Sequence, residues 1–368
     1  MEPFKNIFNK DSVNLIATQI QKAAKKNFKK EPFLKAVLPR LSKLELKDRV
    51  RLISDELNSS LTLSYKKNID ILIKSLAKEG EETGITGFLA WPLLQYVEDY
   101  GREDFETSFK AMYEMTKRFS AEFAIRPFLI ADDKKVFKIL EKWKKDKNHH
   151  IRRLCSEGIR PHLPWGMKVP SIHKDLKRNI KFIESLRNDP EEYVRRSVAN
   201  HLNDISHLDE KLMLDTVCAW NKGKPNDDLK WLIRHSTRTL LKKGHPRALK
   251  LHGYNPKINL SINKLKLSKK KIKEGDSIDF SFEVKNNSKK KEKVLMDYII
   301  HYLKKDGSYS KKAFRFKDSY LAPNTSEPLL KTIKFKKVTT RVHYPGVHKI
   351  SLLINGQEFG ELLFKLSV

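Results

Sequence analysis

Cysteine is scarce in this chain: Cys155 and Cys218 are the only two among 368 residues. Two thiols cannot form a disulfide framework or a four-cysteine zinc site, and this indicates a reducing compartment. Long apolar runs are missing too. No stretch approaches the roughly 18 residues that a membrane span needs, and the first residues lack the apolar segment of a secretory signal. We therefore expect a cytoplasmic protein with no membrane partner.

Motifs of nucleotide and metal chemistry are also missing. The sequence has no P-loop and no GxGxxG before a helix. The pair His149-His150 has no Cys, Asp or His partner at ligand spacing, so a satisfied surface pair is the better interpretation. No nearby His makes a convincing nucleophile–base pair with Cys155 in the sequence, and we expect a small core residue. We predict no cofactor and no metal.

Acidic residues are outnumbered. The 45 Asp and Glu face 75 Lys and Arg, which gives a formal net charge of +30. Such a charge fits a nucleic acid or an anionic membrane surface as partner. A lysine-rich proteome, in which every protein is basic, is the alternative explanation. Hydrophobic residues make up 39% of the chain, enough for folded cores, and we favour nucleic acid as the partner.

The chain divides into two halves of different periodicity. In the first half, apolar residues recur every three or four positions, as across residues 69–77, which predicts amphipathic helices over 1–254. In the second half, apolar and polar residues alternate, as across 278–284, and Asn355-Gly356 between two such runs predicts a hairpin. About seven strands predict a small immunoglobulin-like β-sandwich over 257–368.

The helical half contains a repeat. Three segments each have a polar start, an apolar residue, a basic pair and then an apolar helical face. Their apolar markers, Ile151, Val194 and Ile233, lie 43 and 39 residues apart, a period typical of HEAT or armadillo repeats. Because one repeat cannot bury its apolar face alone, we predict an α-solenoid of stacked HEAT-like repeats.

Stacking would align the basic pairs of the repeats, which are Arg152-Arg153, Arg195-Arg196 and Arg234-His235. Each pair is expected near the first turn of its helix, where free N–H groups and a guanidinium suit a phosphate. For any single pair, an arginine that bonds the preceding loop is the alternative. Three pairs in register, in so basic a chain, favour a nucleic-acid backbone.

Carboxylates stand between these repeats. Glu122 and Glu157 each precede an Ile-Arg-Pro sequence, and Asp204 ends the helix of the next repeat. A solenoid would bring the three to one face. Trp165 follows Pro164 and is expected to be exposed in a loop, whereas Trp91 sits in an apolar helical segment and is expected in the core.

Carboxylates repel phosphate, so their presence in a basic surface suggests a catalytic role. Cleavage of an N-glycosidic bond builds positive charge on the sugar, which a carboxylate stabilises, and an aromatic face suits a cationic base. The alternative is that each acid pairs with a neighbouring arginine such as Arg126 or Arg160. Spacing alone slightly favours that pairing for each acid taken separately.

Five strings carry a resemblance to a known family: AWPLLQYVEDYG (90–101), FSAEFAIRPFL (119–129), SEGIRPHLPWG (156–166), NHLNDIS (200–206) and RHSTRTLLKKGHP (234–246). They closely resemble the AlkC branch of bacterial HEAT-like alkylpurine DNA glycosylases, over about residues 1–255. Some members of that family carry a C-terminal immunoglobulin-like domain. The resemblance implies a monomeric bacterial, nucleoid-associated enzyme that acts on double-stranded DNA containing alkylated bases.

The resemblance further implies a monofunctional glycosylase that releases 3-methyladenine, and also 3-methylcytosine, and leaves an abasic site without a Schiff-base lysine. Glu122, Glu157 and Asp204 would surround the lesion and its deoxyribose, with Asp204 or Glu157 positioning the water. Trp165 would contact the lesion or its sugar. Backbone phosphates would be held by Arg152, Arg153, Arg160, Arg195, Arg196, Arg234, Arg238, Lys242 and Lys243, although Arg160 could instead orient Glu157.

Two other functions stay open at this point. One is a non-catalytic HEAT-repeat adaptor that binds nucleic acid or a protein, in which the acids only form salt bridges. The other is RNA binding with the sandwich as an auxiliary grip. The sandwich carries 25 basic and 11 acidic residues, and we expect it to clamp DNA, because its lysine runs would otherwise lack a partner.

Overall fold

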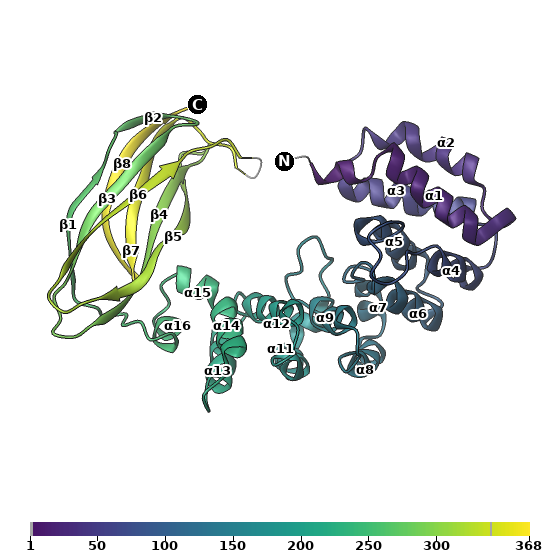
Figure 1. Cartoon of the computed structure of the whole chain (residues 1–368), viewed down its shortest axis with the longest axis horizontal. Coiled ribbons are helices and arrows are strands. Elements are labelled where there is room, and N and C mark those ends of the chain that lie inside the picture. Colours follow the sequence, from purple (N-terminus) through teal and green to yellow (C-terminus); the bar gives the residue numbers. More distant parts are fainter. Residues whose placement is uncertain (1–2, 339–340) are drawn as a thin grey trace. The chain divides into compact units, whose positions relative to one another are not determined.

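The computed structural model describes residues 3–338 and 341–368, which form sixteen α-helices followed by eight β-strands (Figure 1). The helices are α1 (Lys10–Ala24), α2 (Lys30–Leu41), α3 (Leu46–Ser60), α4 (Tyr65–Lys74), α5 (Trp91–Tyr100), α6 (Phe105–Thr116), α7 (Arg126–Ala131), α8 (Asp133–Trp143), α9 (His149–Glu157), α10 (Pro170–Lys174), α11 (Leu176–Ile183), α12 (Glu192–Ile205), α13 (Glu210–Trp220), α14 (Asp227–Ser236), α15 (Arg238–Lys242) and α16 (Pro246–Leu251). The strands are β1 (Leu260–Leu267), β2 (Lys271–Lys273), β3 (Ser277–Asn286), β4 (Glu292–Leu303), β5 (Tyr309–Leu321), β6 (Ser326–Lys334), β7 (Gly346–Ile354) and β8 (Gln357–Ser367). The predicted order, helical repeats and then a sandwich, is confirmed.

The contacts divide the chain into two compact units. One holds the residues up to Thr216 together with Gly223–Ser236, and the other holds Val217–Lys222 together with Thr237–Val368. Helices α15 and α16 therefore belong to the unit of the sandwich. Within that unit the Tyr254 hydroxyl donates to Asp318 at 2.7 Å. The boundary at 254–257, drawn where helices give way to strands, stays a proposal.

Local signals in the sequence explain where helices start. The Asn9 side chain accepts hydrogen bonds from the backbone N–H groups of Asp11 and Ser12, and Ser12 completes a capping box for α1. Asn148 caps α9 in the same way by accepting from the N–H of His150. Such caps satisfy the free donors of a first turn, so they fix the starts of helices that pack by their apolar stripes.

The three repeat segments become α9, α12 and α14. Their apolar markers Ile151, Val194 and Ile233 are all buried, and α12 packs against both α9 and α14. Helices α9 and α12 therefore lie side by side, and they do so at the site described below. Cys155 of α9 is fully buried, as expected of a core residue. No helix in the described part of the chain is both long and apolar enough to cross a membrane.

Two sheets form the sandwich. One has the order β1-β3-β6 and the other β2-β8-β7-β4-β5. Strand β3 alternates as predicted, with Ile278, Phe280, Phe282 and Val284 buried in the core between the sheets. Asn355 and Gly356 form the predicted two-residue turn between β7 and β8, with φ angles of 46° and 83°. Both values lie in the left-handed region that such a hairpin turn requires.

Candidate active site

A hollow of about 410 Å³ lies among α5, the turn before α7, α9, the loop that follows α9, and α12. It is lined by Phe88, Trp91, Arg118, Phe119, Ser120, Glu122, Phe123, His150, Arg153, Glu157, Arg160, Pro164, Trp165 and Tyr193. Three of the four expected catalytic residues, Glu122, Glu157 and Trp165, therefore line one space.

Two arginines link the three acidic residues in a row of alternating charges. Arg153 pairs with Glu122 and, at 3.1 Å, with Glu157. Arg160 lies 2.7 Å from Glu157 and 2.8 Å from Asp204. All five side chains are between 5% and 17% exposed, so the charges face little water. The structure thus brings the three acids together, and it does so through the ion pairs that formed the alternative interpretation of their spacing.

Glu157 is the most fully bonded of the acids. Its Oε1 lies within ion-pair distance of both guanidinium groups, and its Oε2 accepts a hydrogen bond from Ser197 at 2.6 Å. Burial acts to raise the pKa of Glu157, but Arg153 and Arg160 outweigh burial and hold that pKa below its ordinary value. Glu157 is therefore a carboxylate that stays ionised in a nearly dry environment.

Glu122 has the opposite tendency. Burial raises the pKa of Glu122, the Arg153 guanidinium offsets the rise only in part, and the charge of Glu157 adds to it. Glu122 precedes α7 in a turn, and among the described residues its carboxylate forms an ion pair with Arg153 alone. Of the two acids that line the hollow, Glu122 is the one that takes up a proton more readily.

Asp204 reaches the site through Arg160. The Nε and Nη2 groups of Arg160 donate to the two carboxylate oxygens of Asp204 at 2.8 and 3.0 Å, and the backbone N–H of His162 donates at 3.3 Å. Burial raises the pKa of Asp204, and Arg160 opposes the rise. Asp204 is only 5% exposed and does not line the hollow. Its geometry is that of a residue which orients Arg160.

Trp165 is exposed, as expected, with 60% of its surface in water. Its ring is nearly parallel to that of Trp91, with centroids 6.4 Å apart and planes 10° apart. Trp91 is buried, as expected of a core residue, but it also lines the hollow and stacks on Phe119 and Phe123. The two tryptophans thus join an exposed aromatic face to the aromatic core.

The backbone at Trp165 is unusual. Its φ angle is 63°, in the left-handed region that a large side chain rarely adopts. The backbone carbonyl of Trp165 accepts a hydrogen bond from Lys47 of α3 at 3.1 Å, and the N–H of Gly166 donates to Leu163 at 3.1 Å. The hydrogen bond from Lys47, which lies outside the loop, therefore accompanies a backbone conformation that Trp165 would not prefer by itself.

In the first two of the three expected pairs, the first arginine bonds within the protein, whereas Arg234-His235 lies in the last turn of α14 and not, as expected, near its first turn. Arg152 donates to the carbonyls of Asp146 and Lys147 and makes a two-pronged ion pair with Asp189. Arg195 donates to the carbonyls of Asp189 and Pro190 and pairs with Asp228 at 2.7 Å. Both arginines thus tie their own preceding loop to the next repeat, through the loop before α12 in one case and the first turn of α14 in the other. This is the alternative given above for a single arginine.

The second arginines of the pairs differ from each other. Arg153 is drawn into the hollow, where its guanidinium also lies 5.0 Å from the ring centroid of Tyr193. Arg196 is 58% exposed and pairs with Glu192 on the surface. Among the other expected phosphate ligands, Arg234 and Arg238 are half-buried, and Lys242 and Lys243 are exposed. The last three belong to the unit of the sandwich.

Sequence reasoning interpreted His149-His150 as a surface pair, and it placed neither His150 nor Tyr193 in the site. Both line the hollow, and Tyr193 is 41% exposed. Each directly precedes the apolar marker of its repeat, so an alignment of the repeats held the signal that links them. Burial lowers the pKa of His150, which favours a neutral ring beside the hollow. Across residues 3–338 and 341–368, no group of three His, Cys, Asp or Glu side chains is arranged to hold a metal ion.

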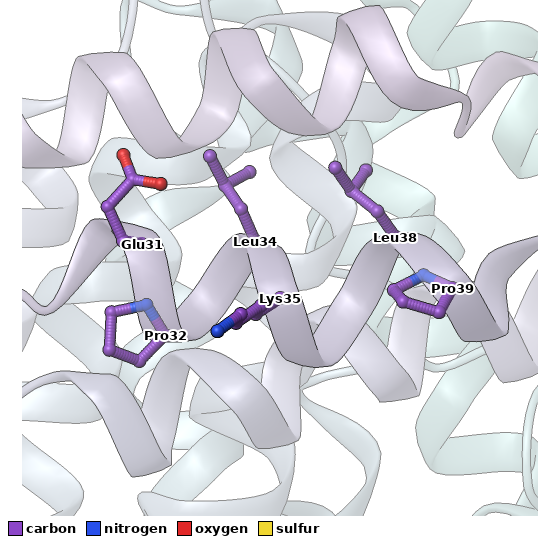
Figure 2. A pocket seen from close by; sticks show the side chains of 6 residues that line it. All are labelled: Glu31, Pro32, Leu34, Lys35, Leu38 and Pro39. Carbon is purple, nitrogen blue, oxygen red and sulfur yellow. The ribbon is translucent and has the colours of Figure 1, made fainter.

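A larger open hollow of about 690 Å³ lies along α2 (Figure 2). Its lining consists of Glu31, Pro32, Leu34, Lys35, Leu38 and Pro39, all from one helix. Figure 2 shows Glu31, Leu34 and Leu38 along one side of that helix. With one carboxylate and one ammonium group and no second helix to complete it, this surface lacks the convergent polar groups of a reactive site.

Comparisons with known proteins agree with the fold. A family model described as "Uncharacterised protein YhaZ, C-terminal Ig-like domain" matches residues 261–368. The uncharacterized protein YhaZ of Bacillus subtilis (strain 168) is 35% identical over 367 residues, which span 100% of both chains. The solved structure of the Pseudomonas fluorescens alkylpurine DNA glycosylase AlkC, bound to DNA containing an abasic site analog, is 33% identical, covers 100% of both chains and superposes with a TM-score of 0.93.

Proposed function

This chain belongs to the AlkC family of alkylpurine DNA glycosylases, and from this premise we propose that it removes cationic alkylated bases from duplex DNA. The substrates proposed are 3-methyladenine and 3-methylcytosine. The reaction is hydrolysis of the N-glycosidic bond, and the product is an abasic site. The resemblance found in the sequence strings is confirmed by the similarity over the whole chain.

One observation carries this proposal: an ionised, nearly dry carboxylate, Glu157, and an exposed tryptophan, Trp165, line the same hollow. When the bond between the sugar and a cationic base breaks, its electron pair neutralises the base, and the positive charge moves to the sugar. A fixed carboxylate stabilises that charge best where water is excluded, because it needs no reorganisation when the charge forms. The face of Trp165 offers a cationic base an additional attraction.

The two acids that line the hollow take different roles in this mechanism. Glu157 keeps its charge because of Arg153 and Arg160, and it stabilises the sugar cation. Glu122 has a raised pKa and accepts a hydrogen bond from the water that adds to the sugar carbon, so that it can take the proton which this water releases. Asp204 holds Arg160, and through Arg160 it fixes Glu157.

Binding of the DNA backbone is proposed for the exposed basic groups Arg196, Lys242 and Lys243. The bonds of Arg152 and Arg195 to loop carbonyls favour a structural role for those two arginines. The lysines of the sandwich are proposed to add further phosphate contacts, so that the sandwich contributes to affinity. The protein is proposed to act as a monomer.

The direct test is release of free base from methylated duplex DNA, resolved by chromatography. The wild-type protein is expected to release 3-methyladenine, and Glu157→Gln is expected to release at least about a hundredfold less, in line with the loss of an electrostatic group. Glu192→Gln, which removes an exposed carboxylate on α12, is the matched control and should keep full activity.

A wild-type protein that binds the DNA but releases no base would overturn the proposal and favour the non-catalytic adaptor. Equal release by Glu157→Gln and wild type would instead move the reaction away from this hollow. Competition between alkylated duplex DNA and structured RNA separates a DNA enzyme from an RNA-binding protein, and the duplex is expected to win.

A further inference from the structure

Residues 158–167, here called the tryptophan loop, connect Glu157 to Trp165 and are held from outside by two cationic side chains. The first is Arg126 at the start of α7. Its Nε donates to the carbonyl of Met167 at 2.6 Å, and its Nη1 donates to the carbonyls of Gly158 and Arg160 at 2.9 and 3.1 Å. One guanidinium therefore joins both ends of the loop.

Arg126 is 1% exposed, and among the described residues no carboxylate lies within ion-pair distance of it. Burial lowers the pKa of Arg126 to about 10, and the neighbouring Arg160 adds to this effect. A buried guanidinium without a carboxylate partner is costly and depends on its hydrogen bonds. The three carbonyls of the tryptophan loop supply those bonds, so the loop and the arginine hold each other in place.

The second cationic side chain is Lys47, near the start of α3. Its Nζ donates to the carbonyl of Trp165 itself at 3.1 Å, across 118 residues of sequence. Trp165 has the unfavourable φ of 63°, and its ring gains little from burial because 60% of it is exposed. Lys47 thus bonds the peptide group that directly follows the α-carbon of Trp165, from which the ring projects.

From these contacts we infer that Lys47 and Arg126 are positioning residues that fix Trp165 parallel to Trp91 at the edge of the hollow. This inference rests on the proposed function for its effect on catalysis. Neither residue needs to contact the DNA. Arg126 sets the path of the tryptophan loop, and Lys47 sets the backbone angle at its exposed end.

Lys47 gives the cleaner test, because it is exposed, whereas a substitution of the buried Arg126 leaves three loop carbonyls without their donor. Lys47→Met removes the hydrogen bond and one positive charge. Lys43→Met is the matched control: Lys43 is exposed, lies four residues away and makes no side-chain hydrogen bond or ion pair among the described residues. Lys47→Arg keeps a donor of similar reach and is expected to restore the wild-type behaviour.

The first measurement does not depend on activity. An indole held in one orientation beside other aromatic rings gives a defined signal in near-ultraviolet circular dichroism, and Trp165→Phe defines the part that depends on Trp165. Lys47→Met is expected to lose most of that part, whereas Lys43→Met and Lys47→Arg keep it. An unchanged signal in Lys47→Met would overturn the inference, whatever reaction the protein catalyses.

The second measurement is single-turnover base release, with DNA affinity measured in parallel. Lys47→Met is expected to slow release about three- to tenfold, the usual effect of one hydrogen bond, with the same affinity as Lys43→Met. In a Trp165→Ala background the same substitution should have no further effect. This control matters because Lys47 also acts on Glu98. Burial raises the pKa of Glu98 to about 6, and the charge of Lys47 lowers that pKa.

An additive loss of rate in the double variant would show that Lys47 acts through another group, and it would contradict the inference. Arg126→Lys serves as a second probe. If it folds, as judged by far-ultraviolet circular dichroism, it should lose the same near-ultraviolet signal, because an ammonium group cannot reach both ends of the tryptophan loop. A wild type that shows the near-ultraviolet signal of an ordered Trp165 but releases no base would refute the proposed function and leave the positioning intact.

Discussion

Arg160 donates to both carboxylate oxygens of Asp204, at 2.8 and 3.0 Å, and with its remaining nitrogen it donates to Glu157 at 2.7 Å. One planar guanidinium therefore connects the end of α9 with the end of α12. A bidentate pair of this kind fixes direction as well as distance. This relationship explains why an acid that does not line the hollow is part of the site.

Loss of Asp204 should cost both stability and activity. Asp204→Asn leaves Arg160 buried with one carboxylate instead of two, and breaking a buried pair from one side typically costs about 3–5 kcal/mol. We expect a lower denaturation midpoint in urea at an unchanged slope, together with slower base release. Glu192→Gln serves as the control, because its carboxylate pairs with Arg196 on the surface. A midpoint equal to that of wild type would contradict the idea that Asp204 holds Arg160.

Trp165 should matter for activity and hardly for stability. Its ring is 60% exposed, so Trp165→Ala removes little buried surface, and the midpoint of thermal unfolding is expected to stay within the error of measurement. Base release should fall at least tenfold, because the face offered to the cationic base is lost. Trp165→Phe keeps an aromatic face and should recover part of the rate. A full rate in Trp165→Ala would exclude any contact of this ring with the lesion or its sugar.

The sequence predicted the fold correctly where apolar residues recur at a regular spacing or a turn has a characteristic motif. The spacing of Ile151, Val194 and Ile233 predicted the stacked helices, because buried positions must recur once per repeat. The alternation in β3 and the turn at Asn355-Gly356 predicted the sandwich for a similar reason. Such regularities depend only on neighbours in the chain.

The site was harder to predict, because its contacts join distant segments. Nothing near Lys47 in the sequence indicates that its side chain bonds a carbonyl 118 residues away. The two Ile-Arg-Pro sequences look alike, yet Arg126 bonds backbone carbonyls and Arg160 bonds carboxylates. The difference depends on what the next repeat presents, Asp204 in one case and the tryptophan loop in the other.

Arg152 and Arg196, from two different repeat pairs, should separate stability from DNA binding. Arg152→Met removes the ties to Asp146, Lys147 and Asp189, and we expect it to lower the denaturation midpoint. Arg196→Met removes an exposed group, so it should leave the midpoint unchanged and weaken DNA binding. The measurement is affinity for duplex DNA over a series of salt concentrations, in which the loss of one phosphate contact lowers the slope by roughly one. Weaker binding with an unchanged slope would mean that Arg196 does not hold a phosphate.

The rate of base release should rise with pH as Glu122 loses its proton. Burial raises the pKa of Glu122 above its ordinary value of 4.5, so the transition should lie above that value. Glu122→Gln should release base slowly and without this transition, which single-turnover rates between pH 5 and pH 8 can show, with DNA incubated alone as the control for spontaneous loss.

Ionisation of Glu122 should also change the stability of the folded protein, which is expected to fall as the pH rises, whereas the rate of base release rises. Because the folded state raises the pKa of Glu122, it binds this proton more tightly than the unfolded chain does, and ionisation of Glu122 costs stability as the pH rises through the interval between the two values. Glu157 has a lowered pKa, so its contribution is present above its ordinary value and is lost only as the pH falls through the lower, folded value. Glu122→Gln should therefore gain stability relative to wild type as the pH rises from 5 to 8. A difference between the two proteins that stays constant over this range would show that Glu122 keeps one protonation state throughout, and it would contradict the predicted transition.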